Sequence, residues 1–121
     1  MKSDTLVYAC SGCSNVAQMT NYVALELTKL ELAEMSCIAG VGGGVPALVK
    51  KAKSANYILA LDGCAFHCTK NCLKQQGLTP DKHLTLSDLG LRKKHHEEFD
   101  RETAQQLIDY LAEELATLEQ A

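Results

Sequence analysis

Cysteine is the residue type that could carry chemistry in this chain, which has six cysteines among 121 residues. Two of them form the motif CSGC (Cys10 and Cys13), two lie in the motif DGCAFHC (Cys64 and Cys68), and Cys37 lies in MSCIAG. Deprotonated cysteine binds Zn²⁺, holds iron–sulfur clusters and acts as a nucleophile. The sequence therefore points to metal binding or to thiol chemistry.

Four short apolar runs that alternate with helical patterns must position these cysteines. Residues 5–9, 35–38, 57–61 and 83–86 are the predicted strands, and a helical apolar spacing follows each of the first three. Strands that alternate with helices favour a parallel sheet with right-handed crossovers. We therefore expect one Rossmann-like α/β domain over residues 1–121, with about four mostly parallel strands and helices on both faces.

The ends of the predicted helices are marked by residues that favour them. Ser14 or Asn15 can cap the first helix, Pro46 suits the first turn of the second, and Gly77 suits the end of the third. Asp100 can cap a last helix. The expected buried stripe of that last helix is Ala104, Leu107, Ile108, Leu111, Leu115 and Leu118.

Three cysteines fall at or just past the ends of three different predicted strands, and this is where open α/β sheets bind ligands. A helix that begins at Cys64 would place Cys64 and Cys68 on one face. Cys72, one turn further along, is expected to be a buried packing residue. Tetrahedral thiolate coordination suits zinc, so the sequence predicts a zinc site. Its candidate ligands are Cys10, Cys13, Cys37, Cys64 and Cys68.

The histidines and one carboxylate near these motifs are weaker candidates. His67 is a minor candidate as a ligand, because adjacent positions on a helix point apart. His95 and His96 lie in a basic run that is typical of a solvated connection. Asp62 is expected to cap the next helix, with a role behind the metal ligands or as a base as alternatives.

Several of these motifs together resemble the DGC-domain family of zinc-binding proteins. The motifs are CSGCSN, MSCIAGVGG, LDGCAFHC and the later SDLG, and they cover most of the chain in the order of the family. The resemblance implies zinc bound by Cys10, Cys37, Cys64 and Cys68. Cys13 and Cys72 depart from the family pattern, which leaves the number of ligands open. The resemblance implies no particular reaction.

Two other functions remain open at this point. A thiol/disulfide or sulfur-transfer enzyme would use Cys10 and Cys13, with the start of a helix lowering the pKa of Cys10. An iron–sulfur protein would use the same thiolates. A closed thiolate site leaves no coordination position for a reacting water, which favours a zinc protein that is not an enzyme.

Composition argues against other classes of partner. The net charge is -3 and aromatic residues make up 5% of the chain with no Trp, so we expect no binding to nucleic acid. Every apolar run is shorter than the roughly 18 residues of a membrane span. The apolar stretch before Cys10 is too short for an export signal. We therefore expect a cytoplasmic protein whose partner is a metal ion, since thiols stay reduced there.

Overall fold

The computed structural model describes residues 5–120 as a four-stranded sheet flanked by helices. The strands are β1 (Thr5–Ala9), β2 (Glu34–Met35), β3 (Tyr57–Asp62) and β4 (Lys82–Thr85), and their order in the sheet is β2-β1-β3-β4. All three pairings are parallel. The predicted α/β fold is therefore confirmed. Residues 1–4 and 121 of the expected domain lie outside the described residues.

The two central strands are buried on both sides because helices cover both faces of the sheet. Every residue of β1 is buried, and so are the last five residues of β3. Alternate residues point to opposite faces: Val7 and Leu59 belong to one apolar cluster, whereas Leu6 and Ile58 belong to the other. This explains why both strands read as continuous apolar runs.

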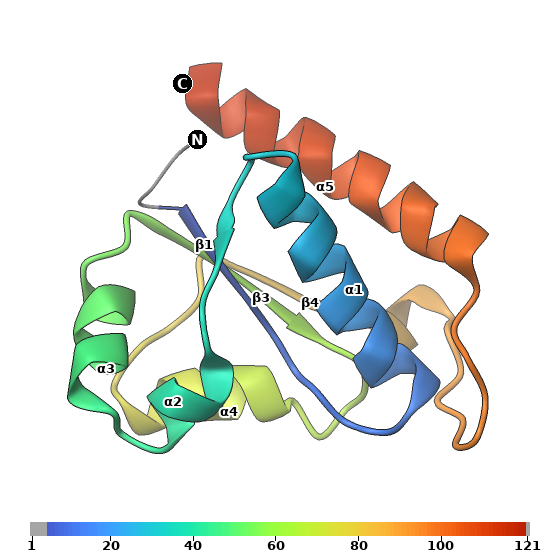
Figure 1. The fold of residues 1–121 in the computed structure, drawn as a ribbon, viewed down its shortest axis with the longest axis horizontal. Coiled ribbons are helices and arrows are strands. Elements are labelled where there is room, and N and C mark those ends of the chain that lie inside the picture. The colour runs from blue at the N-terminus through green and yellow to red at the C-terminus, as the bar shows by residue number, and fades with distance from the viewer. Residues whose placement is uncertain (1–4, 121) are drawn as a thin grey trace.

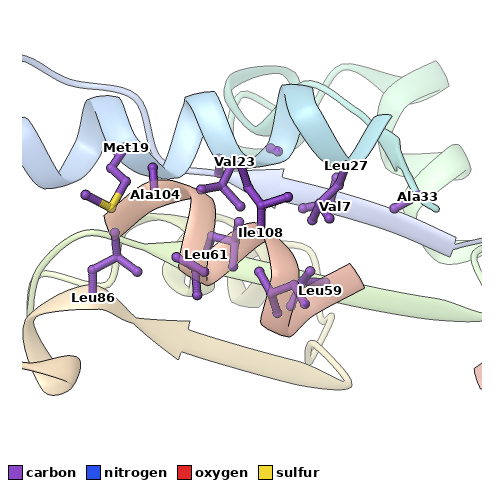
Figure 2. Packing of buried hydrophobic residues seen from close by; sticks show 14 of the residues in the cluster. Val7, Met19, Val23, Leu27, Ala33, Leu59, Leu61, Leu86, Ala104 and Ile108 are labelled. Atoms are coloured by element: carbon purple, nitrogen blue, oxygen red, sulfur yellow. The ribbon is translucent and has the colours of Figure 1, made fainter. Parts of the chain in front are cut away.

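The helices form the two outer layers. Helices α1 (Asn15–Lys29) and α5 (Arg101–Gln120) cover one face, and α2 (Ile38–Gly42), α3 (Pro46–Lys53) and α4 (Cys68–Gln75) cover the other (Figure 1). Figure 2 shows how side chains of α1 and α5 meet those of β1 and β3, with Val23 and Ile108 among them. The three-layer arrangement is as predicted from the sequence.

Most predicted helix ends are confirmed. Ser14 caps α1, since its Oγ accepts the N–H of Ala17 at 3.2 Å. Asp100 caps α5 through the N–H of Thr103 at 3.0 Å, and Gly77 follows α4 with a φ of 73°. One expectation is wrong: Leu118 is 40% exposed, so the buried stripe of α5 ends at Leu115.

The second strand is shorter than predicted. It ends at Met35, and Cys37 instead caps the short helix α2, with its Sγ accepting the N–H of Gly40 at 3.3 Å. The fourth strand is Lys82–Thr85, one residue earlier than expected, and a 3₁₀ turn, η1 (Leu86–Leu89), follows it. Pairing with the neighbouring strand, rather than apolar character alone, decides where each edge strand ends.

The third helix also begins later than predicted. It starts at Cys68, whereas Cys64 lies in the turn before it. His67 precedes the helix with a left-handed φ of 53°, and an α-helix cannot continue through this conformation. Cys64 and Cys68 therefore do not share one helical face.

Within residues 5–120, no helix has the length and apolar character needed to cross a bilayer.

Candidate functional site

Four of the five predicted ligands line one cavity at the carboxyl ends of β1 and β3. Cys10 and Cys13 come from the β1–α1 connection, Cys64 lies in the β3–α4 connection, and Cys68 is the first residue of α4. The cavity has a volume of about 200 Å³. Two segments that are more than 50 residues apart in the sequence thus bring four thiols to one place, as parallel strands that end at the same edge require.

Cys10 is one of the two half-buried thiols of this group, and Cys64 is the other. The Sγ of Cys10 accepts the backbone N–H of Gly63 at 3.2 Å and lies 3.3 Å from the hydroxyl of Thr20. Burial raises the pKa of Cys10, and the contacts with Thr20 and Gly63 offset this only in part. In the absence of a bound cation, Cys10 is therefore a neutral thiol near pH 7.

Cys64 has a cationic neighbour. The Nζ of Lys93 donates to the Sγ of Cys64 at 3.5 Å and lies 4.5 Å from the centre of the Phe66 ring. Phe66 is 72% exposed and also lines the cavity. A lysine in this position offsets the negative charge of a thiolate, and the ring face holds the ammonium group in place.

An imidazole reaches the cavity beside Cys13. The Nδ1 of His95 lies 3.8 Å from the Sγ of Cys13, and both side chains are exposed and line the cavity. The cavity therefore presents four thiols, one imidazole and one ammonium group. The thiols and the imidazole fit Zn²⁺, which prefers sulfur and nitrogen ligands, and the ammonium group can offset the negative charge of the thiolates.

Asn15 fixes the segment that carries Lys93 and His95. The side-chain amide of Asn15 donates to the carbonyl of Arg92 at 3.0 Å and accepts the N–H of Lys94 at 2.7 Å. The backbone N–H of Asn15 donates to the carbonyl of Lys94 at 3.0 Å. The first residue of α1 thereby holds residues 92–94 against the mouth of the cavity.

The basic run around His95 has a second role that its charge pattern alone does not predict. The sequence predicts a solvated connection for the basic run that contains His95 and His96, and residues 92–96 are exposed, but Lys93 and His95 also line the site. One signal could have identified them. A run of basic side chains in a chain rich in thiols is a natural source of counter-charge for thiolates.

Cys37 and Cys72 occupy different surroundings. Cys37 is exposed and lines an adjacent hollow of about 320 Å³, which shares Ser11 with the thiol-lined cavity. Cys72 is half-buried and packs so closely against Gly42 that a Cβ there would lie 2.7 Å from its Sγ. Cys72 thus has the packing contact that was expected, but it is half-buried rather than buried.

The four thiols of the cavity do not point at one common position in this structure. In the part of the chain that the structure describes, no group of three or more His, Cys, Asp or Glu side chains is arranged to hold a metal ion. The cavity contains the right donor types, and a bound ion would require side-chain rotations that turn the exposed thiols inward.

Asp62 is a buried carboxylate at the end of β3, directly before the cavity-lining residues Gly63 and Cys64. It is 1% exposed and accepts the N–H groups of Thr69 at 2.7 Å and of Lys70 at 3.2 Å, so it caps α4 as predicted. Its Oδ2 also lies 2.8 Å from the Nε2 of His83. The ring of His67 stands edge-on to that of His83, with 5.0 Å between the ring centres. No sequence motif singles out His83, because only the pairing of β3 with β4 places it beside Asp62.

The fold and the site define a parallel α/β protein with a cysteine-lined cavity at the carboxyl edge of its sheet. The model of the family described as "DGC domain" matches residues 6–111, and the chain belongs to this family. The resemblance predicted from the motifs is thus confirmed.

The chain is also similar to a protein named "Anaerobic and virulence modulator AnvM" from Pseudomonas aeruginosa. The two are 58% identical over 103 residues, which cover 85% of this chain and 79% of the relative. No solved structure matches the chain.

Proposed function

We propose that this protein binds one zinc ion in the thiol-lined cavity, with ligands drawn from Cys10, Cys13, Cys64 and Cys68. The observation that carries the proposal is the meeting of these four thiols in one cavity of about 200 Å³. Zn²⁺ takes four such ligands in a tetrahedron at about 2.3 Å from each sulfur. Membership of the DGC family supports the same choice of metal, because the motif resemblance implies zinc.

The surroundings of the cavity are suited to the charge of a zinc–thiolate centre. Four thiolates around Zn²⁺ leave a net charge of about -2. Lys93 supplies a positive charge beside Cys64, and the N–H of Gly63 points at the Sγ of Cys10. The first turn of α1 adds its positive dipole end. The raised pKa of Cys10 is compatible with this role, because a bound metal ion displaces the thiol proton.

A modulatory role fits the site better than catalysis. The relative from Pseudomonas aeruginosa is named a modulator, and we extend that class of role to this chain. A zinc ion with four protein ligands holds no water for hydrolysis. The proposal includes a cytoplasmic location, where the thiols would stay reduced.

The alternative of thiol/disulfide exchange through Cys10 and Cys13 has less support. An attacking cysteine needs a lowered pKa, whereas burial raises the pKa of Cys10. The positive charge of Lys93 lies beside Cys64 rather than beside Cys10. The geometry therefore favours metal binding over an activated nucleophile.

Elemental analysis tests the proposal. The protein is purified without added metal, and we expect about one zinc per chain. Cys68→Ser should lose most of this zinc, and Cys72→Ser is the matched control on the same helix, four residues on. Iron with visible absorption would identify a cluster protein instead. A metal-free protein with six thiols that react under native conditions would overturn the proposal.

A further inference from the structure

We propose that His95 is itself a ligand of the bound ion, so that the centre consists of one imidazole and three cavity thiolates. This inference rests on the proposed zinc function and assigns a ligand that the cysteine motifs do not contain. It starts from one contact: the Nδ1 of His95 lies 3.8 Å from the Sγ of Cys13, on the wall of the cavity.

The contact joins two segments that are 82 residues apart in the sequence. Zinc lies about 2.3 Å from a sulfur ligand and about 2.0–2.1 Å from a nitrogen ligand. A sulfur and a nitrogen that are 3.8 Å apart can therefore both bind one zinc ion after only small rotations of the two side chains. The exposure of both side chains leaves them free to make those rotations. Among the side chains that line the cavity, His95 therefore supplies the imidazole nitrogen that can join the thiols as a zinc ligand.

Hydrogen bonds from Asn15 hold the backbone next to His95 in place. Asn15 makes three hydrogen bonds to the preceding residues, two of them with Lys94, which is adjacent to His95. Asn15 is also only two residues from Cys13. The same short segment thus positions both partners of the pair, which reduces the entropy lost when they bind one ion.

Charge favours the mixed set as well. Replacement of one thiolate by a neutral imidazole changes the net charge of the centre from about -2 to about -1. The single ammonium group of Lys93, 3.5 Å from the Sγ of Cys64, can then balance the centre. With four thiolates, one negative charge would remain without a cationic side chain lining the cavity.

X-ray absorption at the zinc edge on the zinc-loaded full chain tests the inference directly. We expect one nitrogen at about 2.0–2.1 Å and three sulfurs at about 2.3 Å in the first shell. His95→Asn should remove the nitrogen and weaken zinc affinity by more than about tenfold, as measured by competition with a chelator.

His96→Asn is the matched control. His96 is exposed and has a left-handed φ of 63°, a conformation that Asn tolerates. This variant should keep the wild-type spectrum and affinity. Asn15→Ala should weaken affinity by about tenfold through loss of the three hydrogen bonds.

The possible failures are distinguishable. Zinc bound by sulfur alone in the wild type, with unchanged affinity in His95→Asn, would overturn the role of His95 and leave the zinc function intact. A chain that binds no zinc would overturn the proposed function and this inference together.

Discussion

Gly63 lies where the β3–α4 connection touches the start of α1, and it leaves no room for a side chain. A Cβ at this position would lie 2.9 Å from both the backbone nitrogen of Ala17 and the carbonyl carbon of Val16, and 2.8 Å from the Cγ2 of Val16. Two of these three atoms belong to the backbone of α1 and cannot rotate away. Gly63→Ala must therefore shift either the first turn of α1 or the turn that carries Cys64.

The expected cost follows from these distances. Overpacking a core typically costs about 1–3 kcal/mol, and a clash with backbone belongs to the upper end of that range. The shift would also strain the bonds from Gly63 N–H to the Sγ of Cys10 and from Ser87 N–H to the carbonyl of Gly63. We expect a loss of about 3 kcal/mol in the free energy of unfolding, which corresponds to a fall in Tm of roughly 10 °C.

Urea unfolding followed by circular dichroism measures the loss, with excess chelator present so that metal does not contribute. Gly12→Ala is the matched control, because Gly12 also lines the cavity but its Cβ would meet only the Cβ of Ala17, at an ordinary 3.5 Å. That variant should stay within about 1 kcal/mol of wild type. If the two variants had equal free energies of unfolding, the claim that a side chain at position 63 clashes with the backbone of α1 would be refuted.

Two further changes test other parts of the site. Cys37→Ser should keep the zinc content of wild type in elemental analysis, because Cys37 lines the adjacent hollow and caps α2; a loss as large as that of Cys68→Ser would place Cys37 among the ligands. Asp62→Ala should lower the free energy of unfolding in urea by roughly 3 kcal/mol, since it removes the α4 cap and leaves buried donors and His83 without their acceptor. Asp62→Asn keeps one acceptor oxygen and should lose less; an unchanged midpoint in both Asp62 variants would contradict the role of this carboxylate.

The sequence alone was sufficient to predict the layers of this fold. Continuous apolar runs such as residues 57–61 and the periodic apolar spacing of α5 are local patterns, and local patterns specify strands and helices. The position of cysteines after two such strands predicted where their thiols would meet, because parallel strands end at one edge of the sheet. The helix caps at Ser14 and Asp100 were equally local and equally predictable.

Only the tertiary structure decided which side chains from distant segments meet in and beside the site. His95 reaches Cys13 across 82 residues, and His83 reaches Asp62 because β4 pairs with β3. Helix α4 begins at Cys68 rather than at Cys64 because the backbone of His67 is left-handed, and no sequence pattern predicts this conformation. These features arise from contacts between distant segments and from single backbone dihedrals, and the periodicity of apolar residues carries no information about either.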